Sequence, residues 1–119
     1  SECQQAATAL AQQCSCIYVP VDSVVQSAMT LVTAAALESG VPVFGSDPVM
    51  AASGALCSVA VGNATIGAAS ADMAAKVLTG TPVSEVPAEV VTDYERDVCQ
   101  ETADALGVVI PDDENIVVL

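Results

Sequence analysis

Two acidic side chains, each next to a serine, follow two short runs of strand-forming residues. Asp22 and Ser23 come after "IYVP" and one further valine, and Ser46 and Asp47 come directly after "VPVFG". Each pair also stands where a helix is predicted to begin, and the free N–H groups of a helix start favour an anion or a carboxylate. Asp22 and Asp47 would in turn meet the ammonium group of a ligand. The plainer interpretation is that both are N-caps, a role that Asp and Ser often have.

The residue types give little support for catalysis. Two carboxylates can act as acid and base, so a small hydrolase that uses Asp22 and Asp47 is one interpretation. The sequence contains no histidine, so neither serine nor cysteine has the usual base beside it. The glycine patterns of dinucleotide-binding and phosphate-binding loops are also absent. We therefore expect no catalytic residue, no cofactor and no enzyme activity.

The five cysteines are Cys3, Cys14, Cys16, Cys57 and Cys99. The "CSC" spacing at residues 14–16 is tighter than that of zinc ligand pairs, and no histidine is present to complete a site, so we expect no metal. The plainest interpretation is that the cysteines are buried thiols that act as small hydrophobic side chains. One disulfide would be compatible with an exported protein.

The composition fits one α/β domain with an aliphatic core. The 119 residues are enough for one domain, and 53% of them are hydrophobic although only 3% are aromatic. The formal net charge is −13, which repels phosphate groups and argues against nucleic-acid binding and against docking on anionic lipid. No run of 18 apolar residues is present, so the sequence contains no candidate membrane span.

Hydrophobic spacing and turn residues predict helices and strands that alternate along the chain. The expected helices cover residues 2–13, about 23–39, about 48–53, about 64–79 and 100–106. The expected strands cover residues 16–20, 41–45, 55–61, 88–92 and 94–99, with a candidate last strand in the tail. This order predicts an α/β fold, with a mostly parallel sheet and helices on both faces.

Ligands of open α/β sheets bind outside the carboxyl ends of the strands. The Asp22–Ser23 and Ser46–Asp47 pairs both follow strand ends of the predicted sheet. We therefore expect the two pairs to lie side by side at one edge of the sheet. Their pairing favours a ligand site there over two unrelated caps.

Four motifs occur in order along nearly the whole chain. They are "YVPVD" at residues 18–22, "PVFGS" at 42–46, "GAL" at 54–56 and "TADALG" at 102–107. In this order and spacing the chain closely resembles the ABC transporter substrate-binding lipoproteins of the tryptophan/tyrosine type. Two positions depart from that family, which usually has Asp where this chain has Gly62 and Asn where it has Cys99. Cysteine is a poor helix cap.

The resemblance implies a flavodoxin-like lobe of a type I periplasmic-binding protein. Residues 1–119 would form a single α/β domain that corresponds mainly to the second lobe. A small solute, such as an aromatic amino acid, would bind in the cleft between two lobes. The family's ligand contacts would fall on Val21, Asp22, Ser23, Ser46, Asp47 and Gly62.

The resemblance also implies partners and a location. The partners would be the membrane permease and the ATPase of an ABC transporter, and the full-length protein would be an extracytoplasmic lipoprotein, periplasmic or at the cell surface. Only the later part of the family's length matches, so the chain would be a truncated fragment. The helix over 64–80 would then pack on the missing first lobe, or on a second copy in a homodimer. The alternative is an isolated flavodoxin-like interaction or regulatory domain with no transport role.

Overall fold

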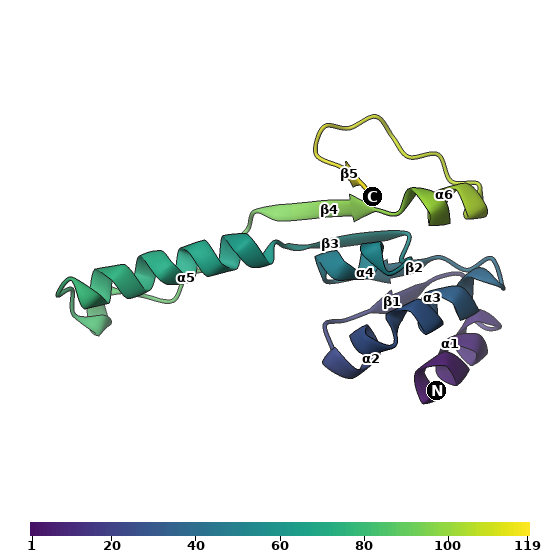
Figure 1. The fold of residues 1–119 in the computed structure, drawn as a ribbon, viewed down its shortest axis with the longest axis horizontal. Helices are drawn as coiled ribbons and strands as arrows, with labels where there is room; N and C mark the ends of the chain where they lie inside the picture. Colours follow the sequence, from purple (N-terminus) through teal and green to yellow (C-terminus); the bar gives the residue numbers. More distant parts are fainter. The chain divides into compact units, whose positions relative to one another are not determined.

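A computed structural model describes all of residues 1–119, and its helices and strands alternate as predicted (Figure 1). The helices are α1 (Glu2–Ala11), α2 (Ser23–Ser27), α3 (Met29–Leu37), α4 (Pro48–Ala52), α5 (Asn63–Leu78) and α6 (Gln100–Leu106), with a 3-10 turn η1 over Val83–Glu85. The strands are β1 (Ile17–Val19), β2 (Val43–Gly45), β3 (Cys57–Val61), β4 (Tyr94–Val98) and β5 (Val117–Val118).

Two expected elements differ from the observed ones. The helix expected over about 23–39 is two helices, α2 and α3, because the backbone of Ala28 leaves the helical conformation at φ −105° and ψ 8°. The strand expected over 88–92 is wrong, since these residues form no helix or strand. Val90 is 83% exposed there. β-branched residues favour a strand only where a neighbouring strand and a buried face are available.

The strands form one sheet in the order β1-β2-β3-β4-β5. β1 pairs with β2, β2 with β3, and β4 with β5, all in parallel. In this register Gly45 of β2 lies between Val19 of β1 and Ser58 of β3. The N–H of Cys99, after β4, donates to the carbonyl of Leu56, before β3, at 3.0 Å, so these two strands run in opposite directions. The expected α/β fold with a mostly parallel sheet is confirmed.

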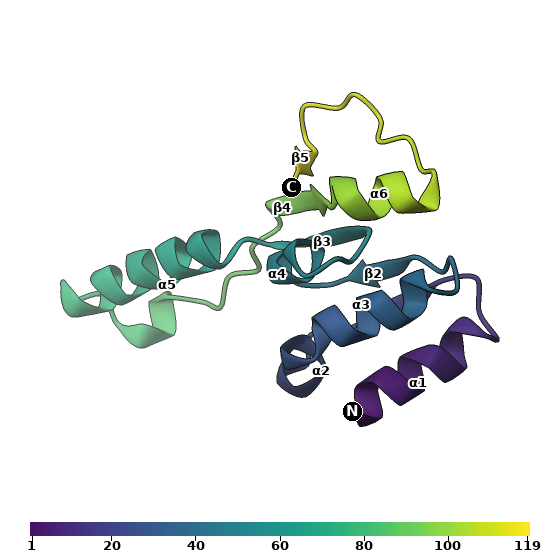
Figure 2. The same ribbon diagram turned by 45° about the vertical axis from the view of Figure 1, so that its right-hand side comes forward.

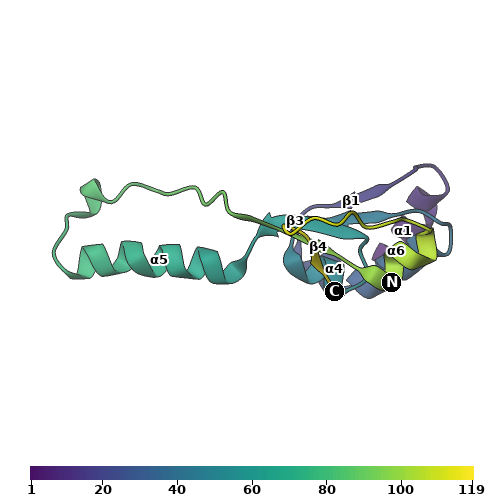
Figure 3. The ribbon, with the colours of Figure 1, turned by 90° about the horizontal axis from the view of Figure 1, so that it is seen from above.

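Helices cover one face of this sheet. Ile17 and Val19 of β1 are buried, whereas Tyr18 between them is 65% exposed and Val59 of β3 is 49% exposed. The view from above shows α1, α4 and α6 on the same side of the strands (Figure 3). Successive strand side chains point to opposite faces, so the alternation marks one covered and one uncovered face. A helical layer was expected on the second face as well, but the helices in residues 1–60 and 95–119 do not form it.

The core lies between the covered face and the helices. It contains Ala7, Ala11, Ile17, Val19, Met29, Val32, Ala35, Ala36, Val41, Val43, Met50 and Ala55. Helices α1 and α3 lie side by side (Figure 2), and α1 also contacts β1. At Gly45 an added Cβ would lie 2.6 Å from the Cβ of Met50, so glycine lets α4 approach the sheet closely. Aliphatic and alanine side chains thus build the core, as the composition predicts.

A buried threonine joins α3 to the end of α4. The Thr33 hydroxyl donates to the carbonyl of Ser53 at 2.9 Å, and it also lies 3.1 Å from the carbonyl of Met29 in its own helix. Replacing Thr33 with the isosteric valine removes this donor. We expect Thr33→Val to lower the free energy of unfolding by about 1–2 kcal/mol, measured by urea denaturation.

The matched control is Thr30→Val, which makes the same change on an exposed position of the same helix. Its unfolding free energy should stay close to that of the wild type, because the Thr30 side chain is exposed and only the carbonyl of Thr30 lies near the Thr33 hydroxyl. Equal losses in the two variants would show that helix propensity, and not the bond to Ser53, carries the effect.

The chain divides into two units. Unit 1 comprises Ser1–Ala60 and Glu95–Leu119, and unit 2 comprises Val61–Tyr94. Unit 1 holds the core described above. Unit 2 holds α5 and η1, and none of the residues of α5 is buried. None of the helices combines the length and the hydrophobicity that a membrane crossing requires.

Candidate ligand-binding edge

The first turn of the candidate site connects β1 to α2. Pro20 and Val21 follow the strand, and Asp22 is the N-cap of α2, in extended backbone at φ −150° and ψ 126°. Its Oδ1 atom accepts hydrogen bonds from the N–H groups of Val24 at 2.9 Å and Val25 at 3.0 Å. These bonds satisfy two donors that the first turn of a helix leaves free. The turn is thus fixed by its own aspartate.

The second turn connects β2 to α4 in the same manner. Asp47 is the N-cap of α4 in extended backbone, and its Oδ1 atom accepts from the N–H of Val49 at 3.0 Å. Pro48 occupies the first helical position, where its missing N–H costs nothing and its fixed φ suits the helix. Both aspartates therefore act as N-caps, as the plainer interpretation predicts. Each uses one of its two carboxylate oxygens for this role.

Two hydrogen bonds join the turns. The Ser46 hydroxyl donates to the carbonyl of Val19 at 2.9 Å, and the Gln26 side-chain amide donates to Oδ1 of Asp47 at 3.4 Å. Since β1 and β2 are parallel neighbours, their carboxyl ends lie at one edge of the sheet. The structure thus places Asp22–Ser23 and Ser46–Asp47 side by side, as predicted.

Several polar and apolar groups at this edge have no partner within the chain. All hydrogen bonds to the two aspartates fall on Oδ1, which leaves Oδ2 of each open. Ser23 is exposed, and Val21 is 67% exposed. The two helices have only five residues each. The aspartate and serine side chains, rather than the helix dipoles, are therefore the groups at this edge that can bind a ligand.

Gly62, the sixth predicted contact, lies at the end of the next strand. It follows β3 and is the N-cap residue of α5, with φ −59° and ψ 135°. It belongs to unit 2, it is buried, and it has backbone groups alone, because glycine has no side chain. The site within unit 1 therefore consists of the turns at residues 20–23 and 46–47.

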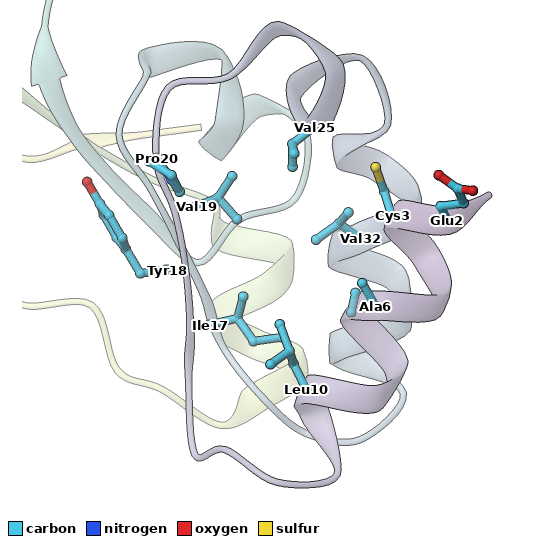
Figure 4. Close-up of a pocket in the computed structure, with 11 residues that line it drawn as sticks. Glu2, Cys3, Ala6, Leu10, Ile17, Tyr18, Val19, Pro20, Val25 and Val32 are labelled. Atoms are coloured by element: carbon cyan, nitrogen blue, oxygen red, sulfur yellow. The ribbon is translucent and has the colours of Figure 1, made fainter.

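An apolar pocket lies beside the first turn and was missed at the level of the sequence. It has a volume of about 380 Å³ between α1, β1 and α3. Figure 4 shows its lining, with Tyr18 turned away from the other side chains. The lining includes Cys3, Ala6, Leu10, Val19, Val25 and Val32. The helical spacing of the α1 residues indicated an apolar face, but only the packing of α1 against β1 creates the cavity.

None of the five cysteines is the fully buried thiol that the sequence suggested. Cys14 and Cys16 are exposed, the other three are partly buried, and all five are free. Cys3 packs against the core as a small hydrophobic side chain, and the buried core cluster itself contains no cysteine. Cys99 is the N-cap of α6 and its side chain caps no backbone N–H, which agrees with its poor capping chemistry. No group of three or more His, Cys, Asp or Glu side chains is arranged to hold a metal ion.

A buried carboxylate on β4 was also missed. Asp97 is 6% exposed, and the neighbouring Ser58 on β3 is 1% exposed. Desolvation by burial raises the pKa of Asp97, and the nearby Ser58 hydroxyl offsets part of this rise. Ser58 Oγ itself has no well-formed hydrogen bond. Burial, and then the negative charge of Asp97, raise the pKa of the Cys57 thiol.

The raised pKa of Asp97 makes stability depend on pH. The unfolded carboxyl titrates near 3.8, so the folded state holds the proton to higher pH than the unfolded state does. The stabilising contribution is complete below pH 3.8 and is lost as the pH rises through the raised pKa. In the Asp97→Asn variant this side chain stays neutral at every pH. The unfolding free energy of the variant, relative to that of the wild type, should therefore increase as the pH rises through the raised pKa of Asp97.

Urea denaturation at a series of pH values measures this difference. Glu95→Gln is the matched control, because Glu95 is an exposed carboxylate on the same strand. A difference between Asp97→Asn and the wild type that stays constant with pH, or that Glu95→Gln reproduces, contradicts the assignment of the pH dependence to Asp97.

Comparison with known proteins gives a family match over almost the whole chain. Residues 1–118 match the family model described as ABC transporter substrate binding protein. A curated relative, the tyrosine-binding protein of Clostridioides difficile strain R20291, is 29% identical over 106 residues. The alignment covers 89% of this chain and 31% of the relative. The chain thus spans about a third of the length of that protein.

Solved structures with the same fold come from three bacteria. A conserved domain protein of Vibrio cholerae has a TM-score of 0.81 at 29% identity, over 93% of this chain and 38% of that one. A ligand-free, open substrate-binding protein with adhesive properties from Clostridium difficile has a TM-score of 0.81 at 30% identity, over 99% of this chain and 40% of that one. An ABC domain from Streptococcus pneumoniae in complex with L-Trp has a TM-score of 0.83 at 24% identity, over 98% and 41%, and shows the fold alone.

Proposed function

Since the chain belongs to the family of ABC transporter substrate-binding proteins, we propose that it forms one wall of a cleft that binds a small solute. The observation that carries this proposal is the pair of turns at one edge of the sheet. The bonds from Ser46 to the Val19 carbonyl and from Gln26 to Asp47 hold these turns together. Two open carboxylate oxygens and the exposed Ser23 hydroxyl thus belong to one edge, at the carboxyl ends of parallel strands, where ligands of such sheets bind.

The chemistry of this edge suits an amino acid. The open oxygens of Asp22 and Asp47 are acceptors for an ammonium group, and a charge-assisted bond of this kind is strong. Val21 and Val24 are each 67% exposed at the same turn and provide apolar surface for a side chain. The curated relative bears the name of a tyrosine-binding protein. We therefore infer an amino acid with an aromatic side chain as the solute.

A second wall has to come from elsewhere in the full-length protein. Small-molecule sites bury most of their ligand in a concave pocket, and the edge in unit 1 is exposed at Val21, Asp22 and Ser23. The chain covers 31% of the curated relative and 38–41% of the three solved structures. In this proposal the remaining length supplies the first lobe and the opposite wall.

Unit 2 would belong to the interface with that first lobe. A helix in water owes most of its stability to packing of an apolar face, yet none of the residues of α5 is buried. Its sequence "NATIGAASADMAAKVL" has only two charged residues. We infer that α5 packs on the first lobe; a homodimer formed through residues 64–80 is the alternative outcome.

The proposal also includes a role in transport, which membership of the family supports. The loaded protein would deliver its solute to the membrane permease and the ATPase of an ABC transporter, outside the cytoplasm and as a lipoprotein. The family is one of substrate-binding proteins and not of enzymes, so we propose neither catalysis nor a cofactor.

Calorimetry with a panel of amino acids tests the proposal. We expect the full-length protein to bind an aromatic amino acid and residues 1–119 alone to give no measurable heat. Binding should return when the missing lobe is added as a separate chain. A full-length protein that binds no amino acid or other small solute contradicts the proposal and favours the interaction or regulatory domain. A stable dimer of residues 1–119 in light scattering contradicts the packing of α5 on the first lobe.

A further inference from the structure

Two exposed cysteines, one residue apart, occupy the loop between α1 and β1. Cys14 and Cys16 are both free thiols on the surface. Backbone hydrogen bonds anchor the loop at both ends, from the N–H of Cys14 to the carbonyl of Leu10 at 2.9 Å and from the N–H of Ile17 to the carbonyl of Pro42 at 3.0 Å. The two thiols are therefore presented on a short stretch of backbone that the fold already holds in place.

The other cysteines lie too far away to act with this pair. Cys3 is in the first turn of α1, eight residues before its end and so about 12 Å along the helix axis. Cys57 is on β3, which β2 separates from β1, so it lies about 10 Å across the sheet. Cys99 directly follows β4, one strand further from β1. No group of three or more metal-binding side chains is found. The pair therefore offers two thiol ligands and no third.

We propose that Cys14 and Cys16 bind a soft monovalent cation, for which Cu(I) is the probe. Thiolates are the ligands that Cu(I) prefers, and it accepts two-coordinate sites. Structural zinc almost always takes four ligands, which this loop cannot provide. The net charge of −13 attracts cations and repels anions. Binding exchanges the two thiol protons for the metal, so it releases protons to the solvent.

The competing fate of the pair is a disulfide across one residue. Such a short ring departs from relaxed disulfide geometry, and strained, exposed disulfides are readily reduced. A non-thiol reductant therefore keeps both thiols available without competing for the metal. The experiment uses the full-length protein under anaerobic conditions, with a chromophoric Cu(I) chelator as the competitor.

We expect the protein to withdraw one Cu(I) from the chelator through this loop, with a thiolate-to-copper charge-transfer band in the ultraviolet. Cys14→Ser and Cys16→Ser should each weaken the binding by about 100-fold, because each removes one of two linked donors. Cys57→Ser and Cys99→Ser are the matched controls and should keep the wild-type affinity. Amino-acid binding measured by calorimetry should be the same in all four variants.

Three results would overturn the inference. The first is wild-type Cu(I) affinity in either loop variant, since a chelate needs both thiols. The second is an equal loss in the Cys57→Ser or Cys99→Ser control, which indicates adventitious thiol binding. The third is displacement of Cu(I) by an equimolar amount of Zn(II), which indicates a site with more ligands than the loop holds.

Discussion

In the full-length protein, replacing both Asp22 and Asp47 with asparagine should weaken amino-acid binding by at least about 100-fold, because each charge-assisted hydrogen bond contributes roughly 1.5–3 kcal/mol and each 1.4 kcal/mol is tenfold in affinity. Asparagine is as good an N-cap as aspartate, so the caps of α2 and α4 and the bond from Gln26 can persist. The free energy of unfolding should therefore change little. Calorimetry and urea denaturation of the same preparations separate the two effects.

Asp112→Asn is the control for this double variant, since it removes one charge from an exposed loop away from the edge. It should leave the dissociation constant unchanged and exclude a general effect of net charge. If the double variant binds its amino acid as tightly as the wild type does, the aspartates are caps alone and the proposed contact with the ammonium group is wrong.

Met50→Ala should lower the free energy of unfolding by about 3 kcal/mol, within the range for large-to-small changes in a core. Met50 is 0% exposed and belongs to the core cluster. It packs against the backbone of Gly45, where even an added Cβ would be too close. Alanine leaves a cavity that the surrounding sheet cannot fill without moving α4. Urea denaturation of residues 1–119 measures the loss.

The neighbouring Val49→Ala is the matched control, because Val49 is on the same helix and is 47% exposed. Val49→Ala should lower the free energy of unfolding by only a small part of the amount expected for Met50→Ala. Because α4 begins at the second turn, Met50→Ala should also weaken solute binding by the full-length protein, and Val49→Ala should not. Similar losses of stability in the two variants would contradict the position of Met50 in the core.

Much of the fold is predictable from residue types that act locally. Pro20 and Pro48 mark the turns, and Asp22 and Asp47 cap the helices that follow, so the sequence places two strand ends next to two helix starts. Parallel pairing of neighbouring strands then brings both turns to one edge. These signals depend on backbone geometry within a few residues, which explains why they are visible without a structure.

The features that sequence reasoning missed depend on residues far apart in the chain. The burial of Asp97 beside Ser58 requires β4 to lie next to β3, although about forty residues separate the two. The uncovered face with Tyr18 follows from which elements pack on the sheet, and valine-rich strands do not reveal that. The strand expected at residues 88–92 failed for the same reason, since a strand needs a partner.

The most direct test is a crystal structure of the full-length protein with tryptophan or tyrosine bound. We expect the ammonium group within hydrogen-bond distance of the carboxylate of Asp22 or Asp47, with the ligand enclosed by a second lobe. An amino acid bound elsewhere, for instance in the apolar pocket between α1 and β1, with both turns open to solvent, would contradict it.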